Sequence, residues 1–202
     1  MSRIVRSVLA VGASVAALVG GVSAAVAEES PAAPASVTAP SAATAVTSAA
    51  AGPSTVQLRA EHSGQCLTLP KASLRNGVNA VQSACADGAE NQWFDLAATG
   101  AGTFELRAGH SGKCLDVEGA AITSGTPVQQ WWCVGAPQQR WRLVMVDIAK
   151  ELYELRPTHT APTTDRCLGI ASASKDDGAS AQLGMCSGTA AQKWRLQPVT
   201  AA

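Results

Sequence analysis

Six cysteines at a repeated spacing constrain the fold of this 202-residue chain more than any other feature. They form three pairs, each with a separation of 19 residues, and a tryptophan follows 8 residues after the second cysteine of every pair. The sequence therefore predicts three copies of one unit, with repeats at about 55–102, 103–151 and 152–200. The pairs are Cys66 and Cys85, Cys114 and Cys133, and Cys167 and Cys186, and the tryptophans are Trp93, Trp141 and Trp194.

Each copy contains short runs in which apolar and polar residues alternate, as in residues 103–107 and 153–156. Gly, Asn, Asp and Pro separate these runs and no helical period is convincing, so the copies are predicted to be all-β. Units of this length are too small to bury separate cores, and we expect the three to share one. The third copy has four extra residues around residues 160–163, where a loop accommodates the change of length.

The repeats resemble the ricin-type β-trefoil lectins over residues 55 to about 198. The middle copy carries His-Ser-Gly-x-Cys-Leu-Asp-Val from His110 to Val117, and the second and third copies end in the family's Gln-x-Trp motif. In the first copy Asn91 stands where the motif has Gln, which weakens that turn. The resemblance implies a β-trefoil of twelve strands, in which three hairpins close a six-stranded barrel about a pseudo-threefold axis.

Residues that recur in all three copies are interpreted as structural. The motif tryptophans are expected in the common core, because buried aromatic side chains contribute large apolar areas. Repeat symmetry predicts one disulfide within each copy, which stabilises the fold by roughly 3 kcal/mol. No CxxC pair sets metal geometry, and the recurring histidines have no accompanying nucleophile, so no metal, cofactor or catalytic role is predicted. These histidines are His62, His110 and His159.

Asp116 and Trp131 occur in the middle copy alone. In the ricin-type family, an Asp two residues after the first cysteine binds vicinal sugar hydroxyls. An aromatic residue two before the second cysteine stacks on the sugar ring, and Gln and Asn side chains complete the pocket. The resemblance therefore implies a carbohydrate site, in which Gln138 departs from the family's usual Asn. The matching residues are Asp116, Gln129, Trp131, Gln138 and Gln139.

The chemistry of these side chains favours the same interpretation without the family. A pyranose offers an apolar face of C–H groups, which an exposed indole such as Trp131 covers. Its hydroxyls donate to a carboxylate such as Asp116, and Gln amides both donate and accept. For the neighbouring Trp132, packing on a loop and extending a sugar platform both stay open. The outer copies lack both groups at the equivalent positions, which are Thr68, Gly169, Ser83 and Gly184.

The N-terminal region has the pattern of a secretory signal. Arg3 and Arg6 precede an apolar stretch from Val8 to Val22, and Ala25-Val26-Ala27 is a small-x-small cleavage site. A signal peptide is therefore predicted over residues 1–27. The alternative is an uncleaved membrane anchor, because the uncharged run is 21 residues long.

The residues between this signal and the repeats differ from both in composition. Residues 28–54 consist mainly of Ala, Ser, Thr and Pro, with no Leu, Ile or aromatic residue to build a core. They are predicted to be a disordered linker. Residues 55–202 then form the trefoil domain.

These observations predict a secreted, extracellular and monomeric lectin that binds a mono-, oligo- or polysaccharide through one site in the middle repeat. The 15 basic and 15 acidic residues cancel, so nothing indicates nucleic acid or an acidic membrane as a partner. The alternative is a trefoil that inhibits another protein through its loops, with decayed sugar sites. An enzyme is not predicted, because no carboxylate pair is placed for glycoside hydrolysis.

Overall fold

The computed structural model describes residues 55–160 and 164–199 of the chain. The signal peptide predicted over residues 1–27 and the linker predicted over residues 28–54 lie outside the described residues, as does most of the insertion predicted in the third copy. In the described ranges, no helix combines the length and the apolar character that crossing a bilayer requires.

Within these ranges the chain forms thirteen β-strands joined by turns and short 3-10 helices. Buried and partly exposed side chains alternate along strands such as β1, as expected where one face packs on a core. The strands are β1 (Thr55–Ala60), β2 (Cys66–Thr68), β3 (Val78–Asn79), β4 (Val81–Ser83), β5 (Trp93–Gly100), β6 (Thr103–Ala108), β7 (Cys114–Val117), β8 (Val128–Trp131), β9 (Arg140–Asp147), β10 (Leu152–Pro157), β11 (Arg166–Ile170), β12 (Ala181–Met185) and β13 (Trp194–Pro198). The 3-10 helices are η1 (Pro70–Ala72), η2 (Glu90–Gln92), η3 (Glu118–Ala120), η4 (Pro137–Gln139), η6 (Ala171–Ala173) and η7 (Ala190–Gln192).

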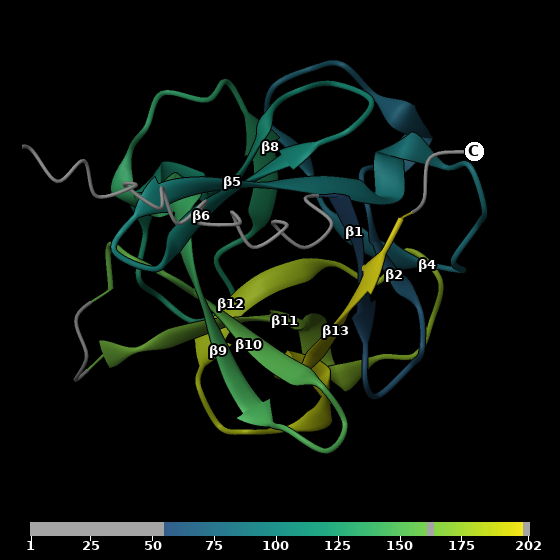
Figure 1. The fold of residues 1–202 in the computed structure, drawn as a ribbon, viewed down its shortest axis with the longest axis vertical. Coiled ribbons are helices and arrows are strands. Elements are labelled where there is room, and N and C mark those ends of the chain that lie inside the picture. The colour runs from purple at the N-terminus through teal and green to yellow at the C-terminus, as the bar shows by residue number, and fades with distance from the viewer. Residues whose placement is uncertain (1–54, 161–163, 200–202) are drawn as a thin grey trace, which may run out of the picture. The chain divides into compact units, whose positions relative to one another are not determined.

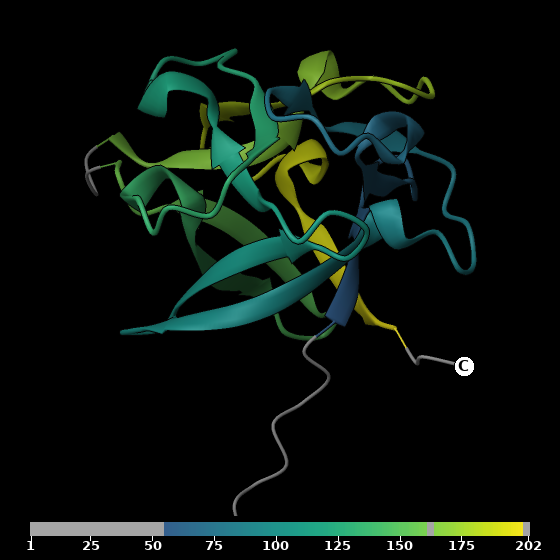
Figure 2. The same cartoon turned by 90° about the horizontal axis from the view of Figure 1, so that it is seen from above.

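Six of the strands close into an antiparallel barrel. β1 pairs with β5 and β13, β6 pairs with β5 and β9, and β10 pairs with β9 and β13. Each copy adds one hairpin, β2–β4, β7–β8 or β11–β12. The copies occupy successive sectors of the ribbon, and the first and last strands lie side by side (Figures 1 and 2). The predicted β-trefoil is confirmed, with β3 as a two-residue addition to the first copy.

Equivalent apolar residues from the three copies meet in one core. Leu58, Leu106 and Leu155 hold the same position in their copies and are fully buried. Trp141 and Trp194 are fully buried as well, and each indole N–H donates to a backbone carbonyl 3.0 Å away. Burial of these rings therefore leaves no polar atom without a partner.

The first copy departs by one residue from the predicted motif. Gln92, rather than Asn91, takes the place of the motif glutamine, and its amide bonds the backbone groups of the two residues that flank Cys85, at 2.9 Å each. Gln139 and Gln192 bond the matching loops of their copies in the same way, at 2.7 to 2.9 Å. The prediction that Asn91 replaces this glutamine and weakens the turn is therefore wrong.

The same shift moves the core aromatic side chain of the first copy from Trp93 to Phe94. Phe94 is fully buried, and it has the pairing register between barrel strands that Trp141 and Trp194 have in their copies. Trp93 lies on the other face of β5 and is only half-buried. The prediction that Trp93 belongs to the common core is wrong, because one extra residue separates Cys85 from its motif.

Each copy also closes its own disulfide, with 5.0 Å between the two Cα atoms in every case. This is the pairing that the repeat symmetry predicts. Each bridge joins the start of the first strand of a hairpin to the loop that follows the second strand, so it closes the open end of the hairpin. The bonded pairs are Cys66–Cys85, Cys114–Cys133 and Cys167–Cys186.

The three equivalent histidines join neighbouring copies. Each Nε2–H donates to the backbone carbonyl that ends the first 3-10 helix of the preceding copy in the cycle. This bond gives a structural reason for the recurrence of histidine in one turn of every copy. The donors and acceptors are His62 and Ser174 (2.8 Å), His110 and Ser73 (3.1 Å), and His159 and Ala121 (3.3 Å).

Candidate functional site

Asp116, Gln129 and Trp131 lie on one face of the β7–β8 hairpin. Asp116 is opposite Gln129 in the antiparallel register, and Trp131 is opposite Cys114, two positions further along. Because successive side chains of a strand point to opposite faces, residues two positions apart project on the same side. The hairpin therefore brings a carboxylate, an amide and an indole together on one surface.

A turn of the first copy supplies a wall beside this surface. The N–H of Gly77 donates to the carbonyl of Gln130 at 3.0 Å, and β3 then pairs with β8. Gly77 has a left-handed φ of 75°, and a Cβ there would lie 3.7 Å from the ring of Trp131 and 3.8 Å from Oε1 of Gln129. Glycine thus lets the backbone run beside the indole without covering it.

These elements enclose a cavity of about 460 Å³. The volume falls within the ~300–1,000 Å³ that small-molecule sites occupy. η3 brings Glu118 to the cavity directly after β7, and η4 brings Gln138. Trp131 leaves 41% of its surface exposed, so its aromatic face is open to a ligand. The lining residues are Gly77, Asp116, Glu118, Gly119, Gln129, Trp131, Val134 and Gln138.

Asp116 is the most constrained polar residue of the cavity, with only 4% of its surface exposed. Nε2 of Gln129 donates to its Oδ1 at 3.0 Å, and the amide of Gln139 also lowers the pKa of this carboxyl. Burial raises the pKa of Asp116 above its ordinary value, because it disfavours the charged form. The amide groups of Gln129 and Gln139 and the charge of His159 offset part of that rise in pKa. The carboxylate is therefore held in place and largely dehydrated before a ligand arrives.

Four of the five residues predicted for the site line the cavity, and the fifth lies behind it. Gln139 is fully buried. Its Oε1 accepts from the N–H of Val134 at 2.9 Å, and its Nε2 donates to the carbonyl of Trp132 at 2.8 Å. These contacts make Gln139 a support of the cavity wall rather than part of its surface.

Sequence reasoning missed four residues of the lining. Glu118 follows Asp116 by two positions, so strand alternation was a signal that pointed to it. Gly77 gave no such signal, because it belongs to the first copy and reaches the site through the pairing of β3 with β8. The other two are Gly119 and Val134.

Trp132 does not line the cavity, although it follows Trp131 directly. Nζ of Lys113 lies 4.0 Å from the centre of its ring, a cation–π contact. The ring is 61% exposed, whereas Lys113 is 5% exposed. The sequence left two roles open for Trp132, packing on a loop and extending a sugar platform. The structure shows a packing contact, with Lys113.

The equivalent positions of the outer copies are filled from within the protein. In the first copy, the buried hydroxyl of Thr68 donates to the carbonyl of Cys66 at 2.9 Å and accepts from Nε2 of Gln92 at 3.1 Å. In the third copy, a Cβ on Gly169 would lie 2.9 Å from Cγ of Gln192. Neither position offers the combination of carboxylate and indole that the middle copy has.

Replacing Gly169 with Asp is therefore expected to destabilise the domain by about 1–3 kcal/mol rather than to create a second site. The new side chain would meet Gln192 and also the carbonyl oxygen of Ala191, 3.2 Å from the added Cβ. Thermal unfolding of the two proteins measures the loss. Ala86→Asp, on an exposed loop, is the control for the added charge. A Gly169→Asp protein that unfolds at the same temperature as the parent contradicts this expectation.

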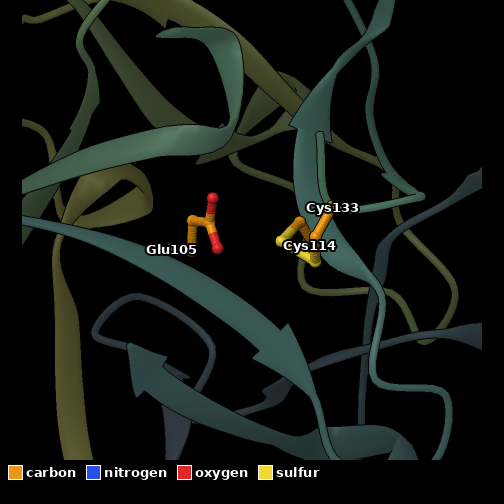
Figure 3. Close-up of side chains that lie close together, drawn as sticks. All are labelled: Glu105, Cys114 and Cys133. Carbon is orange, nitrogen blue, oxygen red and sulfur yellow. A yellow bond between two sulfur atoms is a disulfide. The ribbon is translucent and has the colours of Figure 1, made fainter. Parts of the chain in front are cut away.

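A buried carboxylate also lies beside the disulfide of the middle copy. Figure 3 shows Glu105 next to the Cys114–Cys133 bridge, within the 4.8 Å that ligands of one metal ion would span. The two sulfurs are bonded to each other and are not thiolates, which are the form that binds a metal. Glu105 instead pairs with Arg107, whose Nη2 lies 2.8 Å from the carboxylate.

Comparisons with known proteins agree with this architecture. A family model described as a ricin-type beta-trefoil lectin domain-like family matches residues 45–131 and 96–163. The solved structure of ThreeFoil, a designed threefold-symmetric protein, is 36% identical with a TM-score of 0.67, covering 72% of this chain and 99% of that one. A comparison with curated proteins gave no match.

Two further solved structures have the same fold in other settings. An exo-β-1,3-galactanase from Clostridium thermocellum is 25% identical with a TM-score of 0.66, covering 72% of this chain but 30% of the galactanase. The Macrolepiota procera ricin B-like lectin, solved with lactose, is 18% identical with a TM-score of 0.61, covering 75% of this chain and 99% of the lectin. The fold and the matched family model define a trefoil lectin module. The chain belongs to the ricin-type β-trefoil lectin-like family.

Proposed function

We propose that this protein is a secreted lectin that binds a saccharide through one site, in its middle copy. The observation that carries the proposal is the cavity of about 460 Å³ in which Asp116, Gln129 and Trp131 meet. The family supports sugar binding as the general role. The equivalent positions in the outer copies hold Thr68 and Gly169, which supports a single site.

The cavity has the groups that a pyranose requires. The exposed face of Trp131 suits the apolar C–H face of the ring, a contact that contributes about 0.5–1.5 kcal/mol beyond buried area. The Asp116 carboxylate accepts from two adjacent hydroxyls in charge-assisted bonds, which are roughly twice as strong as neutral ones. Because Gln129 already holds that carboxylate and Asp116 is buried, a sugar does not have to order it on binding.

The proposed role is binding without catalysis. Glycoside hydrolysis needs two carboxyl groups that flank the scissile bond. The carboxylates of the cavity, Asp116 and Glu118, are two residues apart on one segment and approach a ligand from the same wall. The galactanase relative gives no support for catalysis here, because this chain matches only 30% of that protein.

We also propose that residues 1–27 are a cleaved signal peptide and residues 28–54 a linker to the lectin domain at 55–202. The composition of both segments supports this organisation. Three disulfides in a domain of this size are typical of proteins from oxidising compartments. Extracellular localisation follows from the same features.

Titration of the protein with lactose and with N-acetylgalactosamine, followed by a wider glycan array, tests the proposal. We expect one equivalent of sugar per chain, a Kd of roughly 10⁻⁵ to 10⁻³ M, and a change in tryptophan fluorescence. Trp131→Ala should remove the fluorescence response. Ser83→Ala, at the equivalent position of the first copy, should leave it unchanged.

The sugar should be recovered intact after incubation, since no hydrolysis is proposed. Two or three equivalents of similar affinity would contradict a single site, because sugar would then also bind outside the middle copy. Absence of binding across the array, together with binding to a hydrolase, would favour the protein-inhibitor alternative.

A further inference from the structure

Of the four polar side chains that line the cavity, Asp116, Glu118 and Gln129 present acceptors to it, and only Gln138 has an amide that can also donate. Gln129 directs its Nε2 to Asp116 at 3.0 Å, while its Oε1 lies on the side of Gly77, 3.8 Å from where a Cβ would be. The carboxylates of Asp116 and Glu118 accept and do not donate when ionised. A ligand therefore gains most from this lining if it brings N–H and O–H donors.

The charge of the lining also favours a ligand that brings hydrogen-bond donors. Asp116 and Glu118 are both acidic, and none of the described residues that line the cavity is Lys, Arg or His. His159 affects the Asp116 carboxylate through its charge but lies outside the lining. A partly enclosed cavity with one sign of charge attracts ligands of the opposite sign and repels those of the same sign.

We propose that Glu118 is a specificity-determining residue, through which the cavity prefers sugars with a free amine over neutral sugars, and neutral sugars over anionic ones. The proposal rests on the sugar site proposed above and adds its ligand class. An ammonium group has three donors and no acceptor, which matches a wall of oxygen acceptors. An N-acetyl group brings one donor and one acceptor, and a uronic or sialic carboxylate brings only acceptors and a like charge.

Glu118 acts at the edge of the cavity, where its side chain is exposed to solvent. Exposed ion pairs are weak and screened by salt, so its effect on affinity is modest. The buried Asp116 provides the acceptor that every sugar uses, whereas Glu118 changes the ranking among sugars. This division predicts that removing the charge of Glu118 alters selectivity while binding itself persists.

The test is a titration at low ionic strength with galactosamine, N-acetylgalactosamine and galacturonic acid, and with the three corresponding gluco sugars. We expect the free amine to bind about three- to tenfold more tightly than the N-acetyl form, and the uronic acid to bind most weakly. Glu118→Gln should reduce the preference for the amine to about twofold or less. Raising the salt concentration should compress the ranking in the same way.

Glu151→Gln, on the exposed β9–β10 turn, removes the same charge far from the lining and should keep the full preference. Equal affinity for the amine and N-acetyl forms overturns the inference, as does a preference that survives Glu118→Gln undiminished. In both cases neutral sugars still bind and the lectin proposal stands. If none of the sugars alters tryptophan fluorescence and none binds on a glycan array, both proposals fall together.

Discussion

Replacing Trp141 with alanine is expected to lower the free energy of unfolding by about 3–5 kcal/mol, as for other large aromatic residues in cores. Trp141 is fully buried in the core that all three copies share. Its removal leaves a cavity that the rigid barrel strands cannot fill, and it leaves the carbonyl of Leu115 without the indole N–H that bonds it at 3.0 Å. Chemical denaturation followed by circular dichroism measures the loss.

Two other tryptophans provide matched controls for this substitution. Trp131→Ala should change the free energy of unfolding by less than about 1 kcal/mol, because its ring is 41% exposed at the cavity wall. Trp93→Ala should give a loss between the two, because that ring is only half-buried and Phe94 fills the core position. Equal losses from Trp131→Ala and Trp141→Ala would assign Trp131 to the core and remove it from the proposed site.

The fold could be predicted from the sequence because equivalent positions of the three copies can be compared with one another. Each copy contributes one barrel leucine and one disulfide at fixed positions, and a single unit could not bury a core of its own. The register of the first copy could not be predicted in the same way. Counting from Cys85 selects Trp93, whereas the structure selects Phe94, because the amide bonds of Gln92 determine where the motif begins.

Some residues of the candidate site could be predicted from the sequence and others could not, again for physical reasons. The residues on the hairpin itself were predictable, because Asp116, Gln129 and Trp131 belong to one copy and strand pairing brings them to one face. Gly77 was not predictable, because it comes from another copy and matters only because it has no side chain to cover Trp131. Gln139 is a third case, in which the sequence identifies a residue of the site but not that it is buried behind the cavity wall. Gln139 is fully buried, bonds the backbone of Val134 and Trp132, and does not line the cavity.

Asp116→Asn is expected to weaken sugar binding by about ten- to a hundredfold, the effect of losing a charged hydrogen-bond partner worth about 1.5–3 kcal/mol. The amide keeps the size of the side chain, but it loses the negative charge and one of the two acceptor oxygens. Calorimetric titration with the best sugar of the array measures the change. Asp87→Asn, on an exposed loop of the first copy, should bind as the parent protein does.

The same substitution should leave the domain at least as stable as the parent at neutral pH. Burial raises the pKa of Asp116, so the folded state binds this proton more tightly than the unfolded state does. Stability contributed by this group is therefore present in acid. It is lost as the pH rises from the ordinary pKa of an Asp carboxyl through the raised pKa of the folded state. Asp116→Asn removes this dependence, so its advantage in melting temperature should shrink as the pH falls through that window.

Sugar affinity of the parent protein should decrease as the pH falls through the same window, because protonation of Asp116 removes the charge that the hydroxyls contact. A variant that melts lower than the parent at neutral pH while still binding sugar fully would show that Asp116 stabilises the fold, and that the sugar is held by other residues.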